Sequence, residues 1–161
     1  MKQELAQVET PIGAFRAIVR DGVVCTAGFV NTHGVRRDSS GVHLRLAAYF
    51  AGDVDALDAI AVAPEGTEFR QTVWKALREV PAGTTVSYGE LAARVGAPGA
   101  ARAVGTANAT NPICLIIPCH RVIRTGGALG GYGFGLARKR WLLAHEAPAF
   151  ELVSARVPGS R

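Results

Sequence analysis

The sequence contains little sulfur, with three cysteines and one methionine among 161 residues. An odd number of cysteines, without the paired spacings of a disulfide framework or a zinc knuckle, predicts free thiols in a reducing compartment, for which we expect the cytoplasm. The chain also lacks any apolar run approaching the ~20 residues that cross a bilayer, and its first residues lack the apolar stretch of a signal peptide. We therefore expect a soluble protein with no membrane partner.

Acidic residues are scarce in one part of the chain. The net charge is +5, yet residues 1–66 carry six Lys/Arg against eight Asp/Glu, whereas residues 67–147 carry ten against four. A basic excess confined to one part is typical of a surface that binds a polyanion. Charge counting alone also allows a solvated basic surface without such a partner.

The fold class predicted is α/β (α+β), because strand-like patterns come first and helical patterns follow. Residues 1–62 indicate a small sheet with a helix, and residues 63–66 resemble a linker. Residues 67–147 indicate a mostly helical domain, and residues 148–161 a tail.

The N-terminal part begins with signals for a β-meander. Strand-like runs at Phe15–Val19 and Val23–Phe29 are separated by Arg20-Asp21-Gly22, and Asp-Gly between such runs favours a hairpin. Apolar residues from Val42 to Phe50 then recur at helical spacing, and Gly52 ends that element.

The second part opens with Thr67, a suitable N-cap for a helix that Pro81 ends. One apolar face of this helix is expected to be core, and it consists of Phe69, Val73, Trp74, Leu77 and Val80.

Two short helices joined by a Gly/Pro turn follow, which resembles a helix-turn-helix. Ser87-Tyr88-Gly89-Glu90 fits a capping box at the start of the first, and Gly96 suits its C-terminal end. The second, about 100–109, presents small residues and Arg102, which favours minor-groove docking over base reading in the major groove. A tightly packed internal helix is the alternative.

A nucleophilic thiol is indicated by Ile117-Pro118-Cys119-His120-Arg121, where an apolar run stops at a proline and presents cysteine beside histidine. A free cysteine has a pKa of roughly 8.5, so a neighbouring imidazole that takes its proton makes it reactive at neutral pH. A buried structural cysteine is the alternative reading of this pentapeptide.

A glycine-rich loop at residues 126–135 surrounds two aromatic residues and lacks the spacing of a phosphate-binding loop. We interpret it as a flexible pocket wall. A helix over residues 136–145 is predicted next, with Arg138, Lys139 and Arg140 outside and Trp141, Leu142 and Ala144 inside.

With these motifs in order, residues 67–147 resemble O6-alkylguanine-DNA alkyltransferases, also called methylated-DNA–protein-cysteine methyltransferases. Residues 1–66 match more weakly, mainly at Thr10–Gly13 and Leu46–Gly52. The motifs that carry the resemblance are Val86-Ser87-Tyr88, Ala100–Gly105, Asn111-Pro112, Ile117–Val122 and Leu142–Glu146.

The resemblance implies direct DNA repair: an O6-alkylguanine, or an O4-alkylthymine, is flipped from duplex DNA and its alkyl group moves irreversibly to Cys119. His120 would take the thiol proton through a water, Glu146 would steady His120, and Asn111 would brace the turn that holds them. Tyr88 would crowd the target phosphate and donate to the purine. No cofactor and no metal are implied.

The same resemblance assigns the remaining site residues. Arg102 would fill the vacated base stack, and the partner would be double-stranded DNA, bound through the minor groove with little sequence preference by a monomer; cooperativity along DNA stays open. The DNA-binding positions are Arg102, Tyr88, Ala103, Gly105 and Thr125. The pocket positions are Tyr132, Gly133, Val122, Phe134 and Pro118.

Three other classes compete with this reading. An alkyltransferase-like damage-recognition module would keep the fold but lack the acceptor cysteine, which is present here as Cys119. A regulator that senses alkylation would need a further DNA-binding domain. A cysteine hydrolase would need an oxyanion hole, and no signature of one is found.

Overall fold

The computed structural model describes residues 2–147, and their contacts separate them into two units. Unit 1 contains the chain up to Glu65 together with Pro112–Ile116, and unit 2 contains Gly66–Asn111 and the chain from Ile117 onward. Sequence patterns did not indicate that Pro112–Ile116 belongs with unit 1. The main chain explains it, since Ala27 donates to the Pro112 carbonyl (3.0 Å) and accepts from the Cys114 amide (3.1 Å).

Unit 1 contains an antiparallel sheet of three strands in the order β1-β2-β3, namely β1 Gln3–Thr10, β2 Gly13–Arg20 and β3 Val23–Val30. The predicted hairpin turn at Asp21-Gly22 is confirmed. Both residues have positive φ, 50° and 82°, as a tight two-residue hairpin turn requires.

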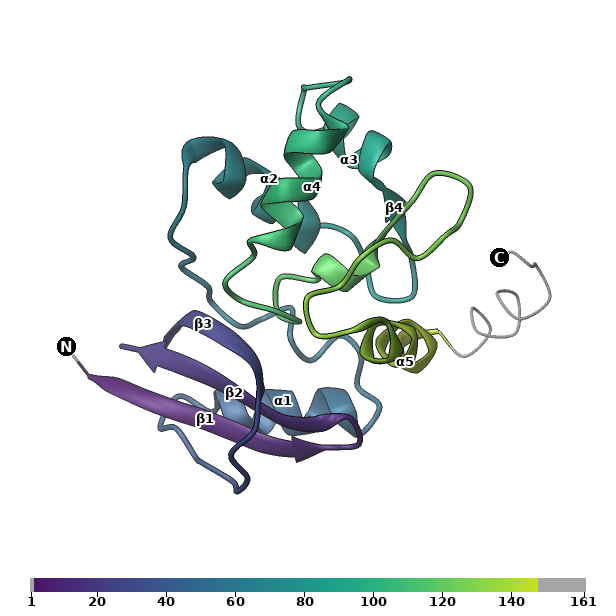
Figure 1. Ribbon diagram of the computed structural model, residues 1–161. Helices are drawn as coiled ribbons and strands as arrows, with labels where there is room; N and C mark the ends of the chain where they lie inside the picture. The colour runs from purple at the N-terminus through teal and green to yellow at the C-terminus, as the bar shows by residue number, and fades with distance from the viewer. Residues whose placement is uncertain (1, 148–161) are drawn as a thin grey trace. The chain divides into compact units, whose positions relative to one another are not determined.

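A helix, α1 (Val42–Phe50), packs against β1 (Figure 1). Its first amides are satisfied by Asp38, whose carboxylate accepts from the backbone N–H groups of Val42 (3.1 Å) and His43 (2.9 Å). The predicted end of the helix is confirmed, because Gly52 adopts a φ of 121° just beyond it.

Unit 2 begins with α2 (Glu68–Arg78), and Thr67 caps it as predicted by accepting the Arg70 amide at 3.2 Å. Phe69 is 36% exposed, so its assignment to the core was wrong. It lies in the first turn of the helix, ahead of the part that other elements cover. The buried side chains of the predicted face are Val73, Trp74, Leu77 and Val80.

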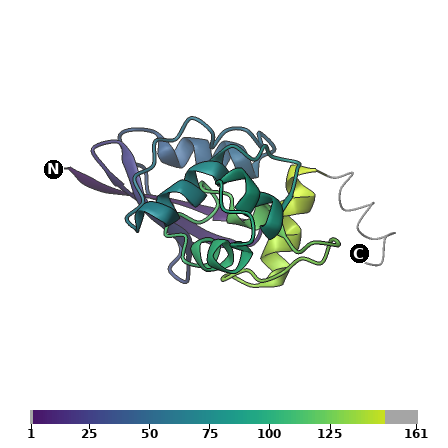
Figure 2. The same ribbon diagram turned by 90° about the horizontal axis from the view of Figure 1, so that it is seen from above.

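The next two helices are α3 (Tyr88–Arg94), which follows the short strand β4 (Val86–Ser87), and α4 (Ala101–Ala109). The predicted capping box is confirmed: the Ser87 side chain accepts the Glu90 amide, and the Glu90 side chain accepts the Ser87 amide. α4 packs against both α2 and α3 (Figures 1 and 2).

The remaining elements of unit 2 bring distant segments together. A 3-10 turn, η1 (Cys119–Arg121), leads into β5 (Val122–Ile123), which pairs in parallel with β4. The last described helix is α5 (Leu136–Glu146). Strands and helices therefore form a mixed α/β fold, as predicted. Among residues 2–147, no helix is long and apolar enough to cross a membrane.

Candidate active site

Cys119 begins the η1 turn directly after Pro118. Its amide donates to the Ile117 carbonyl at 2.8 Å, and the Arg121 amide donates to the Pro118 carbonyl at 3.0 Å. Only 7% of Cys119 is exposed, and Pro118 and Val122 on either side of the turn are buried as well. The cysteine is therefore held on a tight turn, where its side chain is largely shielded from water.

His120 is completely buried and lies next to a carboxylate from the end of α5. Its Nε2 is 2.7 Å from Glu146 Oε2, and Glu146 is itself buried. Burial lowers the pKa of His120 below its ordinary value, and the nearby Glu146 only partly offsets this. The imidazole is therefore neutral near pH 7.

Glu146 remains ionised in this buried position because of its partners. Burial by itself would raise the pKa of Glu146, but His120 and Arg121 outweigh burial and hold the pKa below its ordinary range. Arg121 donates from Nε to Oε1 (2.8 Å) and from Nη2 to Oε2 (2.9 Å), and its Nη1 donates to the Val80 carbonyl (2.7 Å). The positive guanidinium thus balances the negative charge of the carboxylate through a bidentate contact.

This ionisation sets the tautomer of His120. An ionised carboxylate can only accept hydrogen bonds, so His120 Nε2 carries the ring proton and donates a hydrogen bond to Glu146. Nδ1 of the neutral ring then holds a free lone pair, and it has no hydrogen-bond partner among the described residues. A buried base with an open acceptor therefore lies next to Cys119 in the chain.

Two asparagines near the end of α4 donate to the main chain around the cysteine. Asn111 Nδ2 donates a hydrogen bond to the Ile117 carbonyl at 2.8 Å, a position suited to a residue that braces the turn. Asn108, which sequence reasoning missed, is 7% exposed and donates from Nδ2 to the Cys119 carbonyl at 3.3 Å. Helix α4 thus contacts the reactive turn directly.

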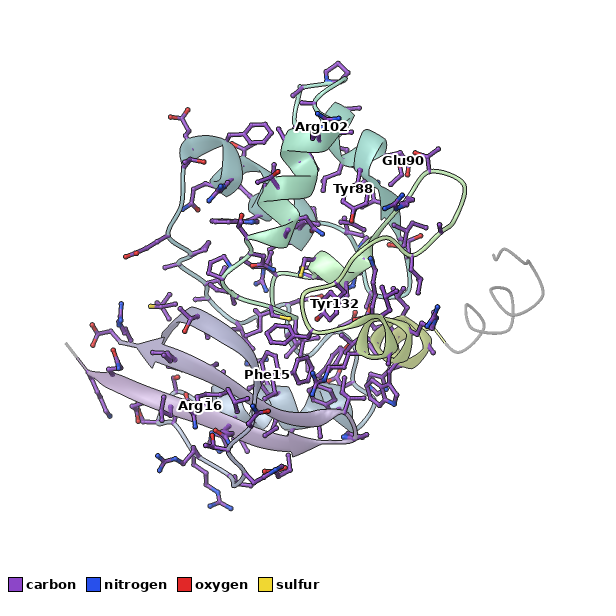
Figure 3. The ribbon with its side chains drawn as sticks, viewed as in Figure 1. Phe15, Arg16, Tyr88, Glu90, Arg102 and Tyr132 are labelled. Carbon is purple, nitrogen blue, oxygen red and sulfur yellow. The ribbon has the colours of Figure 1, made fainter. Side chains whose placement is uncertain are left out.

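Tyr88, the first residue of α3, lies between α4 and the glycine-rich loop. Cβ atoms built on Gly105 and Gly130 would approach its ring at 3.8 Å and its hydroxyl oxygen at 3.2 Å, respectively. Burial raises the pKa of Tyr88, an effect reduced by the charge of Arg124. The phenol is therefore protonated at neutral pH and able to donate a hydrogen bond. Figure 3 labels Tyr88 at the start of α3.

The exposed face of α4 carries Arg102 and Ala103, and Arg102 lies near the N-terminal end of the helix (Figure 3). Gly105 is half-buried beneath Tyr88, and Thr125 is exposed in the loop after β5. The helix itself is fixed to α2, because the buried Trp74 indole donates to the Ala107 carbonyl at 2.8 Å. The predicted DNA-binding residues thus come from α3, α4 and this loop.

The glycine-rich loop carries Tyr132 and Phe134, both half-buried, with ring centroids 6.2 Å apart in an edge-to-face arrangement. Gly133 between them is exposed. The prediction that Lys139 faces outward was wrong, because this side chain is completely buried. Its Nζ donates to the carbonyls of Val122 (2.6 Å), Leu129 (2.5 Å) and Gly131 (3.1 Å).

Lys139 therefore fixes the loop to β5 while placing a charge near the thiol. Burial lowers the pKa of Lys139 to about 8, and the nearby Cys119 acts in the opposite direction. The side chain is thus mostly charged at pH 7. Because the interaction is mutual, the same ammonium stabilises a thiolate at Cys119.

Sequence reasoning assigned no role to Asn108, Lys139 or Arg121. Arg121 belongs to the motif around Cys119. Its position as a charged residue directly after Cys-His was the one sequence signal that could have suggested a role. Nothing in the local sequence distinguishes Lys139 from its basic neighbours or Asn108 from a solvent-facing amide. Among residues 2–147, no group of three or more His, Cys, Asp or Glu side chains could hold a metal ion.

Comparison with known proteins identifies the family. Residues 68–148 match the family model described as 6-O-methylguanine DNA methyltransferase, DNA binding domain. The chain is 45% identical over 153 residues to the methylated-DNA–protein-cysteine methyltransferase of Mycolicibacterium paratuberculosis, covering 89% of this chain and 92% of that protein. It is 53% identical over 106 residues to the protein of the same name from Salmonella typhimurium, covering 66% of this chain and 62% of that protein.

Solved structures show the same fold. The crystal structure of Mycobacterium tuberculosis OGT in complex with DNA matches with a TM-score of 0.75 and 42% sequence identity, over 90% of this chain and 95% of that chain. The free Mycobacterium tuberculosis O6-methylguanine methyltransferase matches with a TM-score of 0.75 and 39% identity, over 91% and 94%. This chain therefore belongs to the family of methylated-DNA–protein-cysteine methyltransferases.

Proposed function

We propose that this protein repairs DNA by transferring the alkyl group from O6 of a damaged guanine, and from O4 of a damaged thymine, to Cys119. The observation that carries the proposal is the buried chain of contacts from Arg121 to Glu146 and from Glu146 to His120, the residue directly after Cys119. The names of the relatives agree with this activity. Each molecule would act once.

The proton of the thiol would move first. Nδ1 of His120 accepts it through a bridging water, and the resulting imidazolium is stabilised by the Glu146 carboxylate at 2.7 Å from Nε2. The ammonium of Lys139 further favours the thiolate. These groups supply a nucleophile at neutral pH without a metal or cofactor.

The thiolate would then attack the alkyl carbon. A sulfur–carbon bond forms, the bond between that carbon and O6 breaks, and its electron pair stays on the oxygen. Tyr88 donates to the purine as negative charge develops on it. The purine takes up the proton that Cys119 lost, and it leaves as neutral guanine. No residue of the site would break the stable thioether, so the product is final.

Access to the base would come from the minor groove. Helix α4 presents Arg102 and small residues such as Ala103, which allow close approach to the duplex, and Arg102 fills the vacated stack. Pro118, Val122, Tyr132, Gly133 and Phe134 would line the pocket for the extruded base. We infer that the protein binds as a monomer, and its three free cysteines favour the reducing cytoplasm.

A damage-recognition module that binds without transfer is the competing function. It requires only the DNA-binding surface and the pocket, and would have no use for a buried base and an ion pair beside a cysteine. The arrangement around Cys119 therefore favours transfer.

The test is the mass of the intact protein after incubation with a duplex that contains O6-methylguanine, followed by peptide mapping. We expect one added methyl group, located on Cys119 and saturating at one per protein. Cys119→Ser provides the control and should bind the duplex without gaining mass. An unchanged mass for the wild-type protein bound to the lesion would establish the recognition module instead.

A further inference from the structure

Arg124 is an exposed arginine in the loop after β5, and none of the proposed steps uses it. Its main chain is held in place, because its amide donates to the Ala128 carbonyl at 2.8 Å and its carbonyl accepts from the Gly127 amide at 3.0 Å. Its side chain makes no hydrogen bond or ion pair with another described residue. The fold therefore fixes where this charge lies, and the charge is available to a partner outside the chain.

The parallel pairing of β4 with β5 places Arg124 next to Tyr88. In the register of these strands, Ser87 pairs with Ile123. Tyr88 and Arg124 come directly after these residues, so both chains leave the ladder side by side and in the same direction. The glycine-rich loop gives independent evidence, because a Cβ atom built on Gly130 would lie 3.2 Å from the Tyr88 hydroxyl oxygen and 3.5 Å from Arg124 Cγ. Both side chains therefore contact the same point of the loop.

Helix α4 itself supplies little charge for the DNA backbone. Arg102 is the one charged residue among Ala101–Ala109, and in the proposed function it fills the vacated base stack. Affinity for duplex DNA comes largely from Lys and Arg side chains that neutralise phosphates. A phosphate near the pocket would therefore be neutralised from another segment, and Arg124 is exposed beside Tyr88.

A flipped base brings its own phosphates to the edge of the pocket. Base and phosphates are joined through a single sugar, so a purine that accepts a hydrogen bond from Tyr88 keeps its flanking phosphates near that side chain. A guanidinium in this position can donate two parallel hydrogen bonds to phosphate oxygens, and these are strengthened by the opposite charges.

We propose that Arg124 binds a phosphate that flanks the flipped nucleotide, and so holds the extruded base in the pocket beside Tyr88. The proposal rests on the proposed function, in which the base is flipped and Tyr88 donates to it. Arg124 contributes to the binding of DNA and takes no part in the chemistry at Cys119. Its removal should therefore affect a lesion in DNA and not a free base.

Binding to duplexes with altered backbones tests this contact. In the unreactive Cys119→Ser background, fluorescence anisotropy gives dissociation constants for a duplex containing O6-methylguanine. Two further duplexes each have one phosphate flanking the lesion replaced by a neutral methylphosphonate. We expect Arg124→Ala to weaken binding to the unmodified duplex about tenfold. With one of the two methylphosphonate duplexes the loss should be under about twofold, because the contacted phosphate is already neutral there.

Salt dependence and a free base provide independent measurements. Arg124→Ala should reduce the slope of log affinity against log salt concentration by about 0.9, the value for one phosphate contact. With Cys119 present, the rate of reaction with free O6-benzylguanine, which has no phosphate, should change less than about twofold. Arg140→Ala, an exposed change on α5, is the control and should have the same effect on all three duplexes.

Two results would overturn the assignment. An equal loss of affinity for all three duplexes on Arg124→Ala would make this residue a source of long-range attraction only. An equal slowing of the reaction with free O6-benzylguanine would place its effect in the pocket and not at a phosphate. If the wild-type protein fails to methylate Cys119, the proposed function falls, whereas the three dissociation constants still decide whether Arg124 contacts a flanking phosphate.

Discussion

Arg121 holds both carboxylate oxygens of Glu146, with Nε 2.8 Å from Oε1 and Nη2 2.9 Å from Oε2. Both residues are buried, and Glu146 Oε2 also accepts from His120. The guanidinium therefore allows a charged carboxylate to exist next to the imidazole inside the protein. Without this counter-charge, Glu146 would be driven toward its neutral form and could no longer stabilise an imidazolium.

Removing one member of this ion pair should destabilise the protein more than removing both. Arg121→Met or Glu146→Gln leaves a buried group without its partner and should lower the free energy of unfolding by about 3–5 kcal/mol. The double variant should lose clearly less than the sum of the two. Urea unfolding at pH 7 measures all three, and Arg140→Met, exposed on the same helix α5, is the control. Additive losses would contradict the pairing.

The buried Lys139 should make stability rise with pH in alkaline solution. Its pKa is about 8 in the folded protein against 10.5 ordinarily, so between these values the unfolded chain binds the proton and the folded protein releases it. Stability relative to Lys139→Met should therefore increase from pH 8 to pH 10.5, by up to about 3 kcal/mol. Urea unfolding across this range measures the difference. Lys75→Met, which removes an exposed lysine, is the control for the loss of a positive charge, and a flat difference for Lys139 would contradict its depressed pKa.

Local signals allowed much of the fold to be predicted. The capping box at Ser87–Glu90 and the tight turn at Asp21-Gly22 depend on residues close in sequence, and both are present as expected. Strands β2 and β3 and helix α1 follow in the same way from short-range apolar patterns, whereas β1 was not predicted from the sequence. The grouping of Pro112–Ile116 with unit 1 could not be predicted, because it depends on main-chain bonds to Ala27, far away in the chain.

The site shows the same division. The family resemblance carried by the motif around Cys119 predicted the site residues. It could not predict which side chains and carbonyls lie against one another in the folded protein. Lys139 lies between two arginines in sequence, and only the three carbonyls that surround Nζ make its burial favourable. The burial of Asn108 is likewise favoured by its hydrogen bond to the Cys119 carbonyl, which the turn places within reach of α4.

Gly66 is expected to tolerate no side chain. A Cβ atom there would lie 2.5 Å from Cη2 of Trp74, whose indole anchors α4 through the Ala107 carbonyl. Gly66→Ala should therefore lower the free energy of unfolding by about 1–3 kcal/mol. Gly89→Ala is the matched control, because its nearest neighbour is 4.0 Å away and it lies in α3, and it should be neutral or stabilise by up to about 1 kcal/mol. Equal effects in chemical denaturation would contradict this contact.

Arg102→Ala should separate base flipping from chemistry. Arg102 is exposed on α4, whereas the groups around Cys119 are buried, so the substitution should slow repair of O6-methylguanine in duplex DNA at least tenfold. Reaction with free O6-benzylguanine, which needs no flipping, should change less than about twofold. Single-turnover rates on the two substrates provide the measurement. Arg94→Ala on α3 controls for the loss of a positive charge, and equal losses on both substrates would exclude the flipping role.

The acid limit of the reaction should lie below the ordinary titration range of histidine. Burial lowers the pKa of His120 from 6.5, so its Nδ1 remains able to accept the thiol proton as the pH falls through that value. The histidine-dependent decline in single-turnover transfer should therefore be centred below pH 6.5, in a range where circular dichroism shows the fold intact. His145→Gln, on the same helix as Glu146, should leave that limit in place. A decline centred at or above pH 6.5 would contradict the lowered pKa of His120.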